Sequence, residues 1–212
     1  MSATIHHPTE SVPRWTTSTV GMNVDILDRM ERAVAKVRER LLRATSALNQ
    51  AGVPYAVVGG NAVASWVATI DEGAVRNTRD IDLLVRRSDL PAITAALEQA
   101  GFVSDEVLDV VMFRDGEQGK PSEAIHLLFA GEKTRSDHQM PAPDIQTVDD
   151  PANFRVITLE SLIILKLLSN RDKDRTHLRD MIGVQLIDES WLNKLPPELA
   201  DRLKQILDTP DA

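Results

Sequence analysis

The sequence of 212 residues contains no cysteine. Disulfide-stapled folds and metal sites built from thiolates are therefore excluded. The N-terminus also lacks the basic and then apolar order of a secretory signal peptide, so we expect a cytoplasmic protein. A chain of this length, 42% hydrophobic, is expected to form one domain with a modest helical addition.

Long apolar runs are missing as well. The strongest candidate for a membrane span, residues 51–70, has no charge over a length that could cross a bilayer. Pro54, Gly59 and Gly60 interrupt it, together with polar residues, so a strand, a glycine turn and a buried helix fit better. We therefore expect no membrane association.

A surplus of basic charge is also absent. The chain has 32 acidic and 24 basic side chains, for a net charge of -8, which argues against a surface that coats nucleic acid. The acidic excess lies in residues 71–150, whereas residues 23–50 and 171–179 are locally basic. A local cationic groove remains compatible with this sequence.

The hydrophobic pattern divides the chain into three parts. Residues 1–22, rich in Ser, Thr and Pro, predict a flexible N-terminal arm. Residues 23–150 predict a catalytic core that opens with a long amphipathic helix over 24–48, and residues 151–212 predict a helical part. The long helix either packs along a sheet or pairs with a second copy of itself.

Alternating strand and helix patterns predict an α/β (α+β) fold with a mixed β-sheet flanked by helices. Residues 131–151 are predicted to form a loop, and the chain is predicted to be helical from residue 158 onward. The remaining predicted elements are strands over 55–58, 80–85, 107–114 and 124–130, and helices over 61–69 and 88–100.

Asp80 and Asp82 are the first candidate site. Two residues apart in a strand, their carboxylates project from the same face and repel each other, which favours a bound cation. Oxygen ligands select Mg²⁺ or Mn²⁺. Acidic residues also decorate solvent-facing strand ends, but Gly59 and Gly60 lie upstream at a strand-to-helix junction, where the backbone can approach a phosphate.

These residues resemble a known signature. Val58-Gly59-Gly60-Asn61-Ala62 and Thr78-Arg79-Asp80-Ile81-Asp82-Leu83 are similar to the hydrophobic-Gly-Gly and Asp-x-Asp motifs of the nucleotidyltransferase superfamily with the polymerase-beta-like catalytic fold. The resemblance covers about residues 53–130. Lys166 and residues 171–180 look similar to the helical part of small stand-alone members, including abortive-infection toxin-type enzymes.

The resemblance implies roles for individual residues. Gly59 and Gly60, with Asn61, would hold the nucleotide phosphates, Asp80 and Asp82 would ligate Mg²⁺ or Mn²⁺, and Thr78 and Arg79 would shape the nucleotide-binding loop before the metal strand. An acceptor hydroxyl would attack the α-phosphate of a nucleoside triphosphate. The acceptor would be a tRNA, a protein or a small molecule, and the further partners to expect are an antitoxin or a second copy in a homodimer.

His126 occupies the position where this family often has a third carboxylate. Three interpretations remain open: a catalytic general base, a metal ligand that favours Mn²⁺ or a later metal, or a histidine packed among apolar neighbours. The substitution also leaves open an alternative function, in which a catalytically weakened module binds a nucleotide or a partner protein in a toxin-antitoxin or regulatory pair.

Two cationic features lie in the predicted helical part. After its first turn, the predicted helix over 159–168 is apolar except for Lys166. This lysine either extends to the surface or reaches the triphosphate of the nucleotide. Arg171 begins a charge-rich run over 171–180. That run is either a solvated helix face held by ion pairs or a wall that binds triphosphate.

Overall fold

The computed structural model describes residues 18–107, 110–150 and 153–209. Most of the predicted arm lies outside these residues. The long helix α1 spans Ser18–Gln50 and therefore begins earlier than residue 24, so that it includes the end of the segment predicted as an arm. Among the described helices, none has the length and hydropathy that a membrane span requires.

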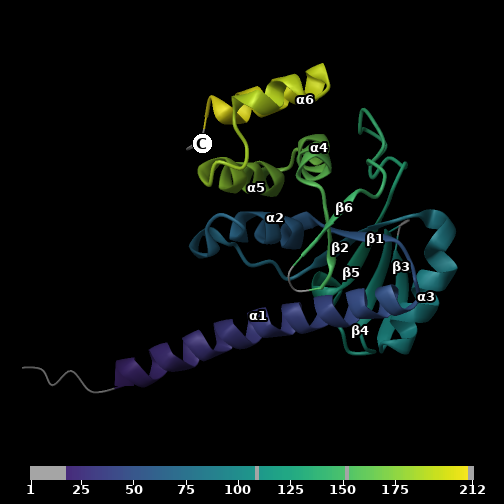
Figure 1. Cartoon of the computed structure of the whole chain (residues 1–212). Helices are drawn as coiled ribbons and strands as arrows, with labels where there is room; N and C mark the ends of the chain where they lie inside the picture. The colour runs from purple at the N-terminus through teal and green to yellow at the C-terminus, as the bar shows by residue number, and fades with distance from the viewer. Residues whose placement is uncertain (1–17, 108–109, 151–152, 210–212) are drawn as a thin grey trace, which may run out of the picture.

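Within the described residues, the strands form one mixed sheet, as predicted, in the order β3-β4-β5-β2-β1-β7-β6 (Figure 1). Strand β2 runs antiparallel to β1 and parallel to β5, and β1 runs parallel to β7. The strands are β1 Tyr55–Val58, β2 Ile81–Val85, β3 Phe102–Val107, β4 Val110–Asp115, β5 Ile125–Phe129, β6 Thr147–Asp149 and β7 Arg155–Ile157.

Helices cover both faces of this sheet. Figure 1 shows α1 and α3 on one side, and α2 on the other side with α4, α5 and α6 stacked beyond it. One apolar core joins the sheet to these C-terminal helices, with fully buried Leu84, Leu162 and Leu178 among its members. The further helices are α2 Gly59–Ala68, α3 Leu90–Gln99, α4 Leu159–Ser169, α5 Asp172–Gly183 and α6 Pro197–Leu207.

Two parts of the sheet differ from the prediction. The strand expected over 107–114 corresponds to β4, and it pairs antiparallel with β3, a strand that was not predicted. Strand β3 lies at the edge of the sheet, and with Ser104, Asp105 and Glu106 it has little apolar pattern. The strands β6 and β7 are three residues each, too short to produce a pattern. They lie at the end of the predicted loop and before α4.

Candidate active site

Gly59 lies where β1 ends and α2 begins. Its φ is +66°, a conformation that residues with a side chain rarely adopt, and a Cβ at this position would clash with the Asp82 carboxylate. A Cβ on Gly60 would lie 2.9 Å from Cβ of Thr78. The two glycines therefore let the first turn of α2 approach the acidic strand closely.

The Asp80 carboxylate is held in place by its neighbours. The Thr78 hydroxyl donates a hydrogen bond to Oδ1 of Asp80, and the Asn61 amide donates to the Asp80 carbonyl at 2.8 Å. Burial alone would raise the pKa of Asp80, but the Thr78 hydrogen bond and the charge of Lys173 outweigh it and hold the pKa below its usual value. Asp80 is therefore an ionised, oriented carboxylate.

Asp82 and His126 are register partners on the parallel strands β2 and β5. Burial raises the pKa of Asp82, and the Asp80 carboxylate raises it further, although nearby cations oppose the shift. Nδ1 of His126 lies 3.9 Å from Oδ1 of Asp82. The possible metal ligands are Asp80, Asp82 and His126. Each offers one ligand atom, and these atoms lie within 4.8 Å of one another.

This donor set fits a small divalent cation. Two carboxylates that repel each other gain most from a cation between them, and their oxygens suit Mg²⁺ or Mn²⁺, whereas an imidazole ligand would favour Mn²⁺ or a later metal. The His126 side chain is 25% exposed and lines the cleft, so it is not a histidine sealed among apolar neighbours. The general-base and metal-ligand interpretations of His126 both agree with its position.

A cationic wall, Lys166, Arg171 and Lys173, faces the acidic strand from α4, α5 and the residues between them. Nζ of Lys173 lies 3.5 Å from Oδ1 of Asp80. Lys166 is 6% exposed and pairs with Oδ1 of Asp174 at 3.0 Å, and Nε of Arg171 donates to Oδ2 of Asp174 at 2.8 Å. Lys166 is therefore buried and paired instead of extending to the surface.

Asp174 organises this wall. Burial would raise its pKa, but the hydrogen bond from Arg171 and the charge of Lys166 lower the pKa to about 2. Burial lowers the pKa of Lys166, and the Asp174 carboxylate opposes that shift. One carboxylate thus fixes two cations at the edge of the cleft.

The acidic strand and the cationic wall border one cleft of about 680 Å³. Seven of the predicted site residues line it: Gly59, Gly60, Asp80, Asp82, His126, Lys166 and Arg171. Asn61, Thr78 and Arg79 are not among the lining residues. Asn61 and Thr78 instead hold Asp80, while the Arg79 side chain is exposed and only its backbone takes part in shaping the loop.

Several residues that line the cleft, or hold the loops beside it, were not predicted from the sequence. Lys173 and Asp174 lie within the predicted charge run, but nothing in that run distinguished them from solvated neighbours. His138 and residues 132–136 gave no signal at all, because they lie in a segment without periodicity. Buried Arg40 of α1 was also missed: it donates to the carbonyls of Glu123 and Arg79, in the two loops that precede β5 and β2.

The mixed sheet, the glycine turn against a paired-carboxylate strand and the helical wall together define a nucleotidyltransferase. The chain belongs to the family described as uncharacterised nucleotidyltransferases, whose model matches residues 25–149. It is thus a transferase, of the class that moves a nucleoside monophosphate from a nucleoside triphosphate. The cationic wall lies outside the matched residues.

Two solved structures, both of ANT(2'')-Ia, show the same fold. The solution structure of the antibiotic-resistance factor ANT(2'')-Ia is 14% identical with a TM-score of 0.54, over 83% of this chain and 93% of that one. The crystal structure of ANT(2'')-Ia with adenylyl-2''-tobramycin is 16% identical with a TM-score of 0.51, over 82% and 98%. An antigenic nucleotidyltransferase-like protein from Paracoccidioides brasiliensis is 17% identical with a TM-score of 0.47, over 84% and 88%. No curated protein matches the sequence.

Proposed function

We propose that this protein is a divalent-metal-dependent nucleotidyltransferase that transfers a nucleoside monophosphate to an acceptor hydroxyl. The observation that carries the proposal is the group formed by Asp80, Asp82 and His126, whose ligand atoms lie within 4.8 Å of one another. This group lies in the same cleft as Lys173 and the N-terminus of α2. The anionic and cationic halves of a triphosphate site therefore face each other.

Asp80 and Asp82 are proposed as metal ligands, and the N-terminus of α2 with the cationic wall as the phosphate site. When bound, Mg²⁺ or Mn²⁺ neutralises phosphate charge and stabilises the leaving pyrophosphate. The first N–H groups of a helix have no partner within that helix, so the start of α2 at Gly59 and Gly60 favours an anion. Lys166 and Arg171 are pre-oriented by Asp174, which limits the entropy lost when they bind a phosphate.

His126 is proposed to act at the acceptor side. In the reaction the acceptor oxygen forms a bond to the α-phosphorus, the bond to pyrophosphate breaks, and the hydroxyl proton must leave. The imidazole lines the cleft beside Asp82, and histidine accepts protons near neutral pH. His126 therefore takes the place of the third carboxylate in this proposal.

The lining charges narrow the class of acceptor. Among the described lining residues, Glu132 and Asp174 are the carboxylates besides Asp80 and Asp82, and each is paired with an arginine. Polycations such as tobramycin, which ANT(2'')-Ia carries as its adenylyl conjugate, would meet little negative charge here. We therefore propose a neutral or anionic acceptor, such as a tRNA end or a protein hydroxyl. The cationic lining residues are Arg87, Lys133, Arg135, Lys166, Arg171 and Lys173.

The test is transfer of label from each α-³²P-labelled nucleoside triphosphate to pools of RNA, protein and aminoglycoside, with Mg²⁺, Mn²⁺ or EDTA. We expect transfer to RNA or protein that needs the metal and that Asp80→Asn reduces at least ~10³-fold. Glu98→Gln, an exposed carboxylate on α3, is the matched control and should retain full activity. His126→Ala should lose activity and His126→Asp should keep it.

The alternative of a catalytically weakened module has one observation in its favour, the histidine in place of a third carboxylate. If nucleotide binds in calorimetry but no label is transferred with any metal or acceptor pool, the module replaces the enzyme as the proposed function. Equal activity of the wild type and Asp80→Asn would reject the metal site.

A further inference from the structure

The end of the cleft away from Asp82 is built by a fixed loop. Residues 131–142, here called the loop wall, are closed by two backbone hydrogen bonds, from Gly131 N–H to the Ala142 carbonyl at 3.0 Å and from Ala142 N–H to the Glu132 carbonyl at 2.8 Å. The Arg87 guanidinium holds Glu132 through two bonds of 2.7 Å. The loop wall is therefore anchored to the end of β2 as a preformed part of the cleft.

His138 is the unusual residue of the loop wall. Its side chain lines the cleft, the residue is 8% exposed, and its Nε2 has no hydrogen-bond partner in the described structure. Burial lowers the pKa of His138, with Asp137 opposing and Arg135, Arg202 and Arg171 adding to the decrease. The ring is thus neutral at pH 7, with one nitrogen able to donate a hydrogen bond and one able to accept.

An unpaired polar atom at a buried position is uncommon in folded proteins and costs free energy unless a ligand or water pairs with it. His138 lines a cleft large enough for a nucleotide, so we take a bound ligand as the hydrogen-bond partner of its Nε2. That ligand must present a hydrogen-bonding group toward the loop wall.

The surroundings of His138 define what kind of ligand fits. Leu128, Leu165 and Leu168 give the cleft apolar surface. The Arg87 guanidinium lies 3.6 Å from the centroid of the Phe129 ring and is held there beside Glu132. Glu132, the carboxylate at this end, is neutralised by Arg87. A planar group with a hydrogen-bonding edge matches these features better than a cation does.

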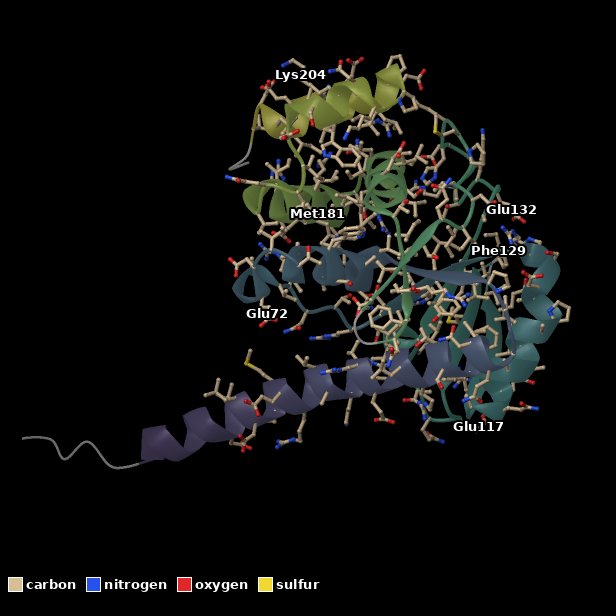
Figure 2. The ribbon with its side chains drawn as sticks, viewed as in Figure 1. Glu72, Glu117, Phe129, Glu132, Met181 and Lys204 are labelled. Atoms are coloured by element: carbon tan, nitrogen blue, oxygen red, sulfur yellow. The ribbon has the colours of Figure 1, made fainter. Side chains whose placement is uncertain are left out.

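The distance along the strands is also suitable. Leu128 lies two residues along β5 from His126, so its side chain projects from the same face of the sheet, about 7 Å from the metal cluster, and it lines the cleft. A nucleotide reaches at least this far from its α-phosphate to its base. Figure 2 shows Phe129 and Glu132 on the same side of the molecule, far from Glu72 beyond the end of α2.

We propose that this end of the cleft, lined by Leu128, Leu165, Leu168 and His138 and here called the base pocket, binds the nucleobase of the triphosphate. His138 hydrogen-bonds to the edge of the base and thereby gives the enzyme a preference among the four nucleotides. This inference rests on the proposed function, because it takes the triphosphate to lie between the cationic wall and Asp80.

The experiment compares binding of the four α,β-methylene nucleoside triphosphates and of inorganic tripolyphosphate by calorimetry, with Mg²⁺ and without acceptor. The variants are His138→Phe, which fills the same space without nitrogen, and His138→Gln, which restores a hydrogen-bonding group. Glu98→Gln is again the control, since Glu98 lies on α3, is exposed and is not among the cleft residues. Thermal unfolding checks that every variant is folded.

We expect the wild type and Glu98→Gln to bind one nucleotide most tightly. His138→Phe should weaken the affinity for that nucleotide about tenfold, because one or two hydrogen bonds are lost, and should leave the affinity for tripolyphosphate unchanged. His138→Gln should recover part of the loss. This pattern would support the base pocket.

Three results would overturn the inference. If His138→Phe keeps the nucleotide preference of the wild type, His138 does not read the base, while the proposed function stands. If the variants bind nucleotides normally but lose transfer to one acceptor, the pocket belongs to the acceptor. If the wild type binds neither nucleotides nor tripolyphosphate, the proposed function fails and the base pocket fails with it.

Discussion

At the scale of single residues, the contact between Gly59 and Asp82 decides how close the phosphate site and the metal site can be. The positive φ of Gly59 turns the chain from β1 into α2, and the missing side chain leaves room for the Asp82 carboxylate. The glycine thus serves two physical purposes at one position. The two purposes can be separated by experiment, because other glycines have a positive φ but no atom close to the missing side chain.

Gly59→Ala is predicted to lower activity at least ~100-fold, because the new methyl group displaces the Asp82 carboxylate. The matched control is Gly52→Ala, where φ is also +66° but no atom lies within 4 Å of the new Cβ. Both variants should lose about 1–2 kcal/mol of stability from backbone strain. Steady-state transfer rates and urea unfolding measure the two effects, and equal activity of the two variants would show that the contact is unimportant.

Residues with a local motif were predictable from the sequence. Gly59, Gly60, Asp80 and Asp82 lie in short segments whose geometry is set by the neighbouring residues, and all four line one cleft in the structure. His138 could not be predicted, because its burial depends on a loop closed by contacts between distant residues. The identity of the cations that face the cleft likewise depends on how the helical part docks.

At the scale of elements, α1 has two halves with different surroundings. From Arg40 onward its apolar positions are buried in the core, as at Leu48, which has no exposed surface. The preceding positions of the same helical stripe include Leu27 and Met30, each 59% exposed, and Figure 1 shows this half projecting beyond the sheet. The sequence pattern is continuous across both halves, so it could not show where packing stops.

Leu48→Ala is predicted to destabilise the protein by about 2–5 kcal/mol, the usual cost of a cavity in a core. Leu27→Ala should change the free energy of unfolding by less than about 0.5 kcal/mol, because that side chain is already in solvent. Urea unfolding at two protein concentrations provides the measurement. A large, concentration-dependent loss in Leu27→Ala would instead indicate that a second copy covers the projecting half.

The order of the main strands and helices was largely predictable, whereas the short and polar strands were not. The strands β1 and β2 are short apolar runs buried along nearly their whole length, and β5 alternates buried and half-buried residues, so their sequences indicate strands. In contrast, β6 is exposed along its whole length, and it forms a strand because β7 offers free backbone groups at the sheet edge. Pairing of this kind leaves little trace in side-chain pattern.

At the scale of the whole molecule, the cleft exists because the sheet and the helical part share one core. The acidic strand belongs to residues that match the family, while the cationic wall belongs to α4, α5 and the residues between them, outside the match. Apolar contacts between α2, α4 and α5 fix the distance between the acidic strand and the cationic wall. The stability of this interface therefore controls the geometry of the site.

A buried histidine makes the stability of the whole molecule depend on pH. His177 of α5 is 6% exposed, and burial lowers its pKa to about 4, with the charges of Lys166 and Lys173 adding to the decrease. In the unfolded chain the same group takes up a proton near pH 6.5. Between these two values the unfolded state binds more protons, so the free energy of unfolding decreases as the pH falls.

The wild type should therefore keep its full stability above pH 6.5 and lose roughly 2–3 kcal/mol through His177 by pH 4.5. Asp174 does not interfere in this range, because its pKa falls from 3.8 to about 2 on folding, so its contribution is lost only at lower pH. Urea unfolding of wild type and His177→Gln from pH 7.5 to 4.5 measures the difference in slope. Since the pKa of His138 is also lowered, it adds to the loss in both proteins. Parallel curves would mean that water reaches His177 in solution and that the interface between the helical part and the sheet is looser than its buried core implies.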